Sequence, residues 1–396
     1  MPGFERFGEE ERKEVNDVLE TGILMRYGFD GPRKDNWKSK ELEAAIAQKL
    51  SVKHVQLVSS GTAALSTAMA ALGIGAGDEV IMPCFTFVAS FEAVLFAGAT
   101  PVMVEIDDTL TLDPKAVEAA ITPKTKAIMP VHMCGGMADL DALQAICKKH
   151  HLLLLEDACQ AIGATYKGKY LGTIGDAGTF SFDFVKTITC AEGGAVMTNN
   201  ADVYTKADGF SDHGHDHLGV DRGADLHPFI GYNFRISELH AAVGLAQWRK
   251  LDEFLAIQRA TKKILRAEIA SIPGISFRRF PDAAGDSATF LEFFLPSLEA
   301  AQKTTAAMKA AGLPAFHYYD NNWHYIRKWN HLKTAATLGA LTPDLTKSLE
   351  AYQDKKFPQS DDLIGRCICM LINLNWSADD IKNKAAAIRK AIESAI

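Results

Sequence analysis

The feature that most constrains the fold is a regular alternation of short apolar runs and helical stretches between about residues 40 and 200. The apolar runs are HVQLVSSG, DEVIMP, TPVMVEI, KAIMPVH, HLLLLED, GTFSFDF and GGAVMT. Runs this apolar are typical of strands that are buried on both faces of a mainly parallel sheet. The stretches KELEAAIAQKL and TAALSTAMAALGIG are typical of helices. The alternation predicts an α/β layered domain.

The C-terminal third of the chain has a different pattern. A long helical stretch over residues 235–268, with Ser237 as a plausible N-cap, would connect the α/β domain to a smaller one. After it, probable strands (GISFRRF, ATFLEFFLP and CICMLINL) mix with helices, which is typical of an α+β module. We therefore expect a large domain over residues 1–250, including the N-terminal segment, and a small domain over residues 251–396.

Charge and composition exclude several classes of partner. A net charge of −7 and a pI near 6.0 argue against nucleic acid or an anionic membrane as the main partner. No apolar run reaches the roughly 18 to 20 residues of a membrane span, and the charged start is unlike a signal peptide. We therefore expect a cytoplasmic protein. The seven cysteines mostly lie in apolar stretches without metal-ligand spacing, which predicts free thiols and no metal site.

The first segment with chemical character is Ser59-Ser60-Gly61-Thr62, between an apolar run and a helix. Small residues let backbone amides approach an anion, and the N-terminus of a helix favours negative charge. Gly61 and Thr62 are therefore candidate phosphate ligands. The same residue types also cap helices, so this segment alone leaves both interpretations open.

The second segment, Glu156-Asp157-Ala158-Cys159-Gln160, directly follows the run LLLL. It places a carboxylate at the C-terminal end of a parallel strand, where α/β sheets bind ligands. Asp157 could pair with the protonated ring nitrogen of a pyridine cofactor and keep the ring electron-withdrawing. A helix cap after the strand is the alternative.

The third segment, SFDFVKTITCAEGG, contains Lys186 among apolar and small residues. Burying a lysine charge is costly, so a buried lysine here would favour the neutral, nucleophilic amine that forms a Schiff base. The alternative is a loop lysine that extends to the surface. The fourth segment, GYNFRISE, opens the long helix, where Asn233 and Arg235 could reach a ligand or simply form the helix entry.

Taken together, the segments SSGTAAL, PCFTFVAS, EDACQAIG, SFDFVKTITCAEGGAVMT and GYNFRISELHAAVGLAQ resemble the DegT/StrS-type sugar aminotransferases, over about residues 25–395. The resemblance implies a pyridoxal-phosphate (PLP) enzyme of fold type I, like aspartate aminotransferase. It further implies a large domain with a mainly parallel seven-stranded sheet and a small α+β C-terminal domain. Many relatives have histidine where this chain has Asp183, which puts the local contacts in doubt but not the lysine.

The resemblance also implies a role for individual residues. Lys186 would bind PLP as a Schiff base and move the proton, Asp157 would pair with the pyridine nitrogen, and Gln160 would lie near the ring hydroxyl. Phe87 would stack on the ring. The remaining positions would hold the phosphate: Gly61, Thr62, Ser181 and, from the neighbouring subunit, Asn233. A homodimer with shared active sites is therefore expected, with ping-pong transfer of an amino group from L-glutamate.

The acceptor is suggested by three segments, RYGFDGPRKDNW, VKTITCAEGG and SDHGHDHLG. They resemble the enzymes that make 8-amino-3,8-dideoxy-manno-octulosonate, a lipopolysaccharide sugar, from a C8 aldehyde on a free sugar acid. Candidate substrate residues by location are Arg26, Arg33, His213, His215, Arg235 and His324. The histidines of residues 213–217 could instead form a solvated polar loop.

Three other functions compete with this assignment. The first is an aminotransferase for a nucleotide-linked keto-hexose. The second is a PLP- or PMP-dependent sugar dehydratase, which Lys186 disfavours because that branch of the family has histidine in its place. The third is a PLP-binding regulator, which lacks support because no basic DNA-binding arm is visible.

Overall fold

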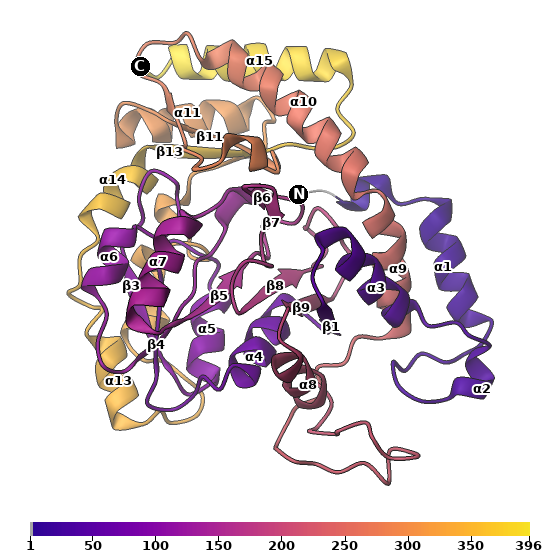
Figure 1. Ribbon diagram of the computed structural model, residues 1–396. Helices are drawn as coiled ribbons and strands as arrows, with labels where there is room; N and C mark the ends of the chain where they lie inside the picture. Colours follow the sequence, from indigo (N-terminus) through magenta and orange to yellow (C-terminus); the bar gives the residue numbers. More distant parts are fainter. Residues whose placement is uncertain (1–2) are drawn as a thin grey trace.

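The computed structural model describes residues 3–396 and contains a large central sheet. Seven strands follow the order β1-β9-β8-β5-β4-β2-β3 (Figure 1). β9 runs antiparallel to both of its neighbours, and the other four pairings are parallel. The predicted mainly parallel, seven-stranded sheet is therefore confirmed. The strands are β1 His54–Val58, β2 Glu79–Pro83, β3 Thr100–Val104, β4 Thr125–Ile128, β5 Leu153–Asp157, β8 Ala177–Ser181 and β9 Gly194–Thr198.

Helices cover both faces of this sheet because successive strand residues point to opposite sides. Leu57 and Ile81 belong to the core shared with α3, α7 and α9, whereas Val58 and Met82 belong to the core shared with α4, α5 and α8. Both faces are apolar, as expected for strands with nearly continuous apolar sequence. The helices of the first 250 residues are α1 Glu9–Leu19, α2 Asp30–Arg33, α3 Lys38–Leu50, α4 Gly61–Ala71, α5 Ala89–Phe96, α6 Pro114–Ala119, α7 Leu140–His150, α8 Ala201–Phe210 and α9 Glu238–Arg249.

The long helix expected over residues 235–268 is two helices, which corrects that prediction. Ser237 caps the first as expected, since its Oγ accepts the His240 amide at 3.2 Å. α9 ends at Arg249 and α10 (Leu251–Ile269) begins directly after Lys250, whose φ of −91° and ψ of −3° depart from helical values. α9 packs on α1 and α3, while α10 packs on β11 and α15 (Figure 1).

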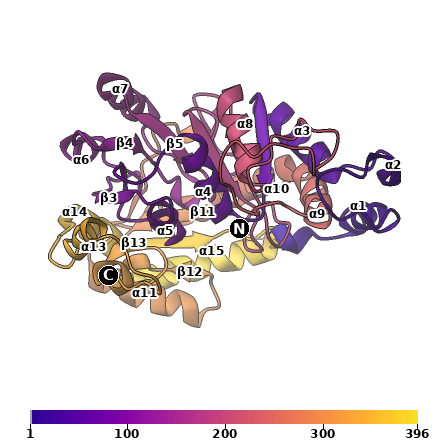
Figure 2. The same ribbon diagram turned by 90° about the horizontal axis from the view of Figure 1, so that it is seen from below.

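The C-terminal third forms a second, antiparallel sheet in the order β10-β11-β13-β12. Phe293 and Ile368 face a core shared with α10, α11 and α15, and Phe294 and Cys367 face the core of the large sheet. Helices α10, α11 and α15 accordingly lie on the side of this sheet that faces away from the large one (Figures 1 and 2). The elements are β10 Ser276–Phe277, β11 Phe290–Phe294, α11 Leu298–Ala310, β12 Ala315–Phe316, α12 Asn330–Lys333, α13 Pro343–Glu350, α14 Pro358–Arg366, β13 Cys367–Leu371 and α15 Ala378–Glu393.

The edge of the large sheet formed by β3 is covered by side chains from the C-terminal third. The Tyr352 hydroxyl accepts the Met103 amide of β3 at 2.7 Å and donates to the Pro101 carbonyl at 2.9 Å. Lys355 Nζ donates to the Met103 carbonyl at 2.8 Å. These contacts satisfy backbone groups that an edge strand otherwise leaves unpaired.

Two further features bear on the sequence predictions. A short hairpin, β6 Thr165–Tyr166 and β7 Lys169–Tyr170, lies outside both sheets. No helix among residues 3–396 has both the length and the apolar character needed to cross a bilayer. The division into domains at residue 250 stays a prediction.

Candidate cofactor site

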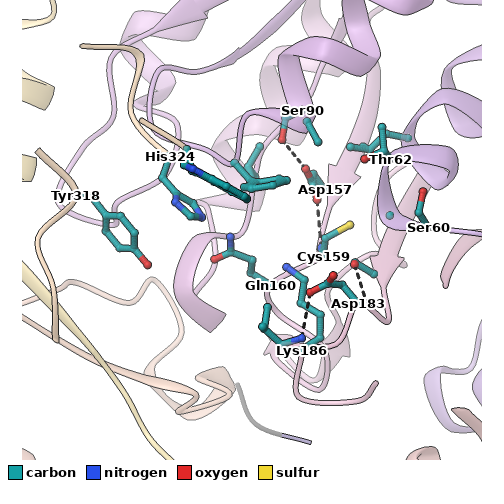
Figure 3. A pocket seen from close by; sticks show the side chains of 18 of the residues that line it. Ser60, Thr62, Ser90, Asp157, Cys159, Gln160, Asp183, Lys186, Tyr318 and His324 are labelled. Atoms are coloured by element: carbon teal, nitrogen blue, oxygen red, sulfur yellow. Dashed lines mark hydrogen bonds between the residues drawn. The ribbon is translucent and has the colours of Figure 1, made fainter. Parts of the chain in front are cut away.

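The main cavity of the described chain, about 480 Å³ in volume, opens at the C-terminal ends of β1, β5 and β8 (Figure 3). This is the edge at which parallel strands of an α/β sheet bind ligands. It brings together eight of the predicted site residues: Gly61, Thr62, Phe87, Asp157, Gln160, Ser181, Lys186 and His324. Segments 230 residues or more apart in the chain therefore meet in one site.

One end of the cavity is formed by the N-terminus of α4 and the end of β8. Ser60 caps α4 by accepting the Ala63 amide at 3.0 Å, so the capping interpretation of this segment is confirmed. The amides of Gly61 and Thr62 precede that bond and have no partner within the helix. A Cβ on Gly61 would come within 2.7 Å of Ser181 Cβ, so only glycine allows this close approach. Backbone amides, a helix dipole and a serine hydroxyl thus converge, as phosphate binding requires.

Asp157 lies at the end of β5 and is 4% exposed. Its Oδ2 accepts the Ser90 hydroxyl at 2.8 Å, and its Oδ1 accepts the Cys159 amide at 3.2 Å (Figure 3). Within residues 3–396 no lysine, arginine or histidine forms an ion pair with it. A buried carboxylate without a cation is costly. The site is therefore suited to a ligand that brings a positive charge to this carboxylate.

Lys186 lies in a turn after β8 that Asp183 organises. The Lys186 amide donates to the Asp183 carbonyl at 3.0 Å, and the Asp183 carboxylate accepts the Val185 amide at 3.0 Å. Asp183 therefore fixes the turn at the position where many relatives have histidine. Lys186 is half-buried and its neighbours Phe184 and Val185 are more than half exposed, so its position lies between the two alternatives of a buried lysine and a surface lysine. Its amine forms no ion pair within residues 3–396 and lines the cavity.

The wall opposite the sheet is aromatic and comes from the C-terminal third. His324 packs against Phe87, with ring centroids 5.4 Å apart, and against Tyr318 at 4.9 Å. The ring contacts Asn321 Oδ1 through Nδ1 at 3.1 Å. Burial, followed by the nearby charge of Lys186, lowers the pKa of His324 to about 4. The imidazole is therefore neutral at physiological pH, and its Nε2 is free to contact a polar ligand group.

Buried polar contacts support the floor of the cavity. Gln160 Oε1 accepts the Cys134 amide at 3.1 Å, which leaves its amide nitrogen for other contacts. The side chains of Glu156 and His132 are both fully buried and meet at 3.1 Å. Glu156 also accepts the amides of Gly172, Ile174 and Gly175. This network fixes the strand end that carries Asp157.

Six predicted residues lie outside this cavity. Arg33 is fully buried, and its Nε donates to the Gly28 carbonyl at 2.6 Å. Its Nη1 also forms an ion pair with Glu238 Oε1 at 3.6 Å. Arg26 is buried and paired with Glu43 at 2.6 Å. Both guanidinium groups are neutralised within the subunit, so the structure argues against their predicted role as cations for an acidic substrate. Asn233 and His213 are exposed, and the segment between α8 and α9 to which they belong protrudes from the large sheet (Figure 1).

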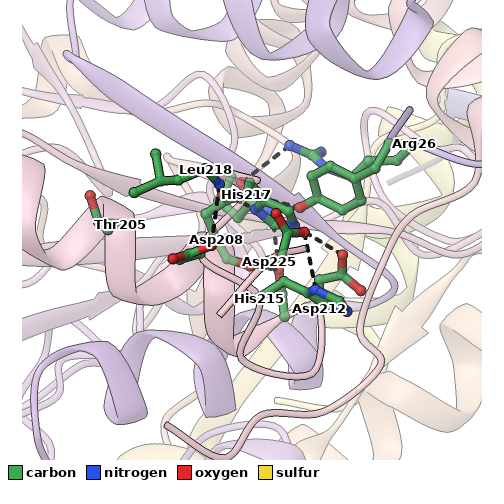
Figure 4. A network of polar contacts seen from close by, with 12 residues as sticks. Arg26, Thr205, Asp208, Asp212, His215, His217, Leu218 and Asp225 are labelled. Carbon is green, nitrogen blue, oxygen red and sulfur yellow. Dashed lines mark hydrogen bonds and ion pairs between the residues drawn. The ribbon is translucent and has the colours of Figure 1, made fainter. Parts of the chain in front are cut away.

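Arg235 belongs to a polar network around that segment, and His215 lies beside this network, with its ring centroid 6.0 Å from that of His217 (Figure 4). Asp212 is fully buried and accepts bonds from Arg222, from Arg235 at 2.5 Å and from His217 at 3.0 Å. Burial opposes its charge, but these three cationic groups hold the pKa of Asp212 well below its usual range. We call the set Tyr27, Asp208, Asp212, His217, Arg222 and Arg235 the loop network. Arg235 is thereby engaged by a carboxylate of its own chain.

The histidines of residues 213–217 are thus partly structural. His217 lies between Asp208 at 2.7 Å and Asp212 at 3.0 Å, and its ring stacks on Tyr27 at 4.2 Å. Burial opposes protonation, but the two carboxylates raise the pKa of His217 to about 9. His215 contacts Asp225 at 3.1 Å. Among residues 3–396 no group of His, Cys, Asp or Glu is arranged to hold a metal ion.

Several residues of the cavity were missed by the sequence analysis. Ser90 lies in the quoted segment PCFTFVAS, but its side chain was not assigned. Tyr318 and Trp323 precede the predicted residue His324 in the sequence and were not assigned either. The sequence signal for Ser90 was its spacing of four residues from Thr86. The hydroxyl oxygens of these two residues lie 2.7 Å apart.

Comparisons with known proteins agree with this geometry. A sequence profile of the DegT/DnrJ/EryC1/StrS aminotransferase family matches residues 5–389. GDP-perosamine synthase from Caulobacter vibrioides is 45% identical over 222 residues, which cover 54% of this chain and 57% of that relative. The match therefore spans little more than half the length of that curated relative.

Solved structures extend the similarity to almost the whole chain. A 3-amino-5-hydroxybenzoic acid synthase is 32% identical with a TM-score of 0.82, and the match covers 98% of both chains. An aminotransferase from Psychrobacter cryohalolentis is 28% identical with a TM-score of 0.85, again over 98% of both chains. The similar structures include one in the pyridoxamine phosphate form, so the predicted cofactor and the type I fold are confirmed.

Proposed function

Because the chain belongs to the DegT/DnrJ/EryC1/StrS aminotransferase family, whose members depend on PLP, we propose that it transfers the amino group of L-glutamate to a sugar carbonyl. The observation that carries this proposal is the pair of unpaired charged groups in one cavity. Asp157 lacks a cation and Lys186 lacks a carboxylate within residues 3–396. PLP complements both, because it brings a basic ring nitrogen and an aldehyde.

The residues of the cavity fit PLP at its three polar positions. Gly61, Thr62 and Ser181 would hold the phosphate through amides and a hydroxyl at the start of α4. Asp157, fixed by Ser90 and the Cys159 amide, would hold the ring nitrogen protonated. The amide nitrogen of Gln160 would face the ring hydroxyl, and Phe87 would cover one face of the ring.

When bound, PLP supplies an aldehyde that condenses with amines and a ring that accepts electron density from the carbon losing its proton. The chain supplies the proton transfers. The Lys186 amine lines the cavity and is positioned by its own turn, so it would remove the α-proton of the donor and deliver a proton to the cofactor carbon bonded to the transferred nitrogen. His324 is neutral and adjacent, so it would accept a hydrogen bond from a sugar hydroxyl.

For the acceptor we propose the C8 aldehyde of 3,8-dideoxy-8-oxo-manno-octulosonate, giving 8-amino-3,8-dideoxy-manno-octulosonate for lipopolysaccharide. Two of the segments with that resemblance, RYGFDGPRKDNW and SDHGHDHLG, contact each other through the loop network. The Tyr27 hydroxyl of the former donates to Asp208 at 2.7 Å, and the Tyr27 ring stacks on His217 of the latter. Their spatial association supports a shared role, although Arg26 and Arg33 are not the cations that would bind the acid.

A second acceptor is supported by a specific observation. The relative that is 45% identical over about half of the chain is a synthase of GDP-perosamine, a nucleotide-linked amino sugar. A keto-hexose attached to a nucleotide is therefore the alternative acceptor.

We further propose that the enzyme is a homodimer. Asn233 is exposed and lies outside the cavity of its own subunit. The same protruding segment exposes Leu218, Val220, Leu226 and Ile230, each by more than 70%. Exposed apolar side chains at this density mark an interaction surface, and a second copy of the chain would bring Asn233 toward a neighbouring site.

The first experiment is an absorbance spectrum of the purified enzyme before and after addition of glutamate. We expect a visible band that glutamate converts to the near-ultraviolet band of the pyridoxamine form. Stoichiometric 2-oxoglutarate is then measured with the octulosonate aldehyde and with a panel of nucleotide-linked keto-hexoses. A protein without bound PLP, or one that never forms 2-oxoglutarate, would contradict the proposed reaction. Turnover of nucleotide sugars alone would replace the proposed acceptor by the alternative.

A further inference from the structure

A second cavity, of about 350 Å³, lies in the C-terminal third between residues 325–333 and 353–361. Its wall is dominated by cations, and Asp361 is the carboxylate among its lining residues. The cations are Arg327, Lys328, Lys333, Lys355 and Lys356. Five positive side chains around one cavity stand out in a protein whose net charge is −7.

Most of this charge is not neutralised by the protein. Arg327 and Lys328 share one carboxylate, that of Asp320, at 3.8 Å and 3.4 Å. Lys333, Lys355 and Lys356 form no ion pair with any carboxylate in the described part of the chain. Asp361 is itself engaged, because it accepts the Tyr325 hydroxyl at 2.8 Å. The loop network shows the opposite arrangement, since each of its cations has a carboxylate partner.

Three of the five cations also make positioning contacts with the protein. Lys333 Nζ donates to the Arg327 carbonyl at 2.9 Å, and Lys355 Nζ donates to the Met103 carbonyl at 2.8 Å. Arg327 stacks on Tyr319 with 4.4 Å between the guanidinium carbon and the ring centroid. Burial, and then the charge of Arg327, lowers the pKa of Lys333. An anion bound here would relieve this crowding of positive charge.

We propose that this cavity binds a small anion that carries a diphosphate group. Lysine ammonium groups and arginine forks are the side chains that bind phosphate oxygens in proteins. The cavity volume falls in the range of small-molecule sites, about 300 to 1,000 Å³, so it has room for two linked phosphates and for a nucleoside attached to them. The shared chemistry is the diphosphate, and inorganic pyrophosphate and a nucleoside diphosphate are its two sources.

The position of this cavity connects it to the cofactor site. His324 lines the cofactor cavity, and the next residue, Tyr325, lines the second one. Residues 324–326 are bonded to the chain that follows β2. The Thr86 amide donates to the His324 carbonyl, and the Ile326 amide donates to the Cys84 carbonyl. A ligand in the second cavity would therefore contact the reverse side of the wall that carries His324.

The test is calorimetric titration of the PLP-loaded enzyme with inorganic pyrophosphate, with uridine diphosphate and with inorganic phosphate. PLP fills the phosphate position of the main site, so that position does not compete. We expect one diphosphate per chain, with an affinity that falls as salt increases, and weaker binding of phosphate. Tighter binding of uridine diphosphate than of pyrophosphate would identify the nucleotide as the source, and equal binding would identify the diphosphate alone.

Charge-matched variants locate the site. Lys333→Gln/Lys356→Gln removes two cations from the cavity and should weaken diphosphate binding at least tenfold. Lys263→Gln/Lys382→Gln removes two exposed cations elsewhere and should leave binding unchanged. Lys356→Glu alone, at an exposed residue, should show the same loss if the first variant melts early. Equal affinity in the cavity variants and the control, or no binding of either diphosphate at millimolar concentration, would overturn the proposal.

Discussion

The cofactor cavity and the loop network use the same residue types in opposite ways. In the cavity, Asp157 is buried without a cation and Lys186 lines the wall without a carboxylate. In the loop network, Asp212 is equally buried but is paired with two arginines and a histidine. A charged side chain whose partners are all protein groups stabilises the fold, whereas one left unpaired retains its capacity to bind a ligand. The state of the partners, more than the residue type, separates binding sites from structural networks.

The largest effect should follow from Lys186→Ala. This change removes the amine that binds the cofactor and moves the proton, so turnover should fall by about 10⁴-fold or more. The visible absorption band should disappear while circular dichroism and melting temperature stay close to those of the parent without PLP, because Lys186 makes no ion pair in the fold. Turnover within tenfold of the parent would assign the chemistry to another residue.

The next effect should follow from Asp157→Asn. The amide keeps the size of the side chain and its contact with Ser90 but offers no negative charge to the ring nitrogen. We expect kcat to fall by roughly 10²- to 10³-fold, in the range seen when one preorganised electrostatic contact is removed. Ser90→Ala, which removes only the supporting hydrogen bond, should cost less. Equal rates for parent and Asp157→Asn would show that a different carboxylate serves the cofactor.

Asp212→Asn tests the other half of the comparison. It removes the carboxylate that three cationic groups share, and breaking a buried ion pair costs about 3 to 5 kcal/mol of stability. The melting temperature should fall clearly, while Asp202→Asn, at an exposed carboxylate paired only with Lys206, should leave it unchanged. An Asp212→Asn variant with unchanged melting temperature but without bound PLP would place the loop network in the cofactor site and remove the distinction.

The smallest effect should be a pH dependence of stability from His217. Its folded pKa of about 9 lies above the ordinary value of 6.5, so the imidazolium stabilises the folded state more than the unfolded one. This contribution is fully present below pH 6.5 and is lost as pH rises through about 9. The melting temperature of the parent should therefore exceed that of His217→Gln by most at pH 6, and the difference should shrink toward pH 10. A difference in melting temperature that is constant over this pH range would contradict a protonated His217 in the folded state.

The fold could be predicted largely from sequence because its pattern is local. The seven apolar runs correspond to the seven strands of the large sheet, and Ser60 and Ser237 cap helices as their positions suggest. The break at Lys250 could not be predicted, because the helical periodicity continues across it and the change in direction is imposed by packing on two different layers.

From local pattern alone, the candidate site was predictable only where residues follow strand ends, and the family resemblance supplied the rest. Asp157, Ser181 and Gly61 lie at the same sheet edge for topological reasons, and the structure brings them together. The contributions of Tyr318 and Trp323 depend on how the C-terminal third packs on the large sheet, which no local pattern encodes, and His324 was predicted only through the resemblance. The partners of Arg26, Arg33 and Arg235 are carboxylates distant in sequence, so a location near the resemblance segments could not reveal that these charges are already neutralised.

The covering of β3 by Tyr352 has a consequence for the way the chain is made. Met103 and Tyr352 are 249 residues apart, and synthesis proceeds at about 5 to 20 residues per second, so the edge of β3 stays open for roughly 12 to 50 seconds after it emerges. During that interval the nascent chain presents an unpaired strand to its neighbours on the same messenger. The edge of β3 therefore becomes covered only late in synthesis, once Tyr352 has emerged and packed on the large sheet.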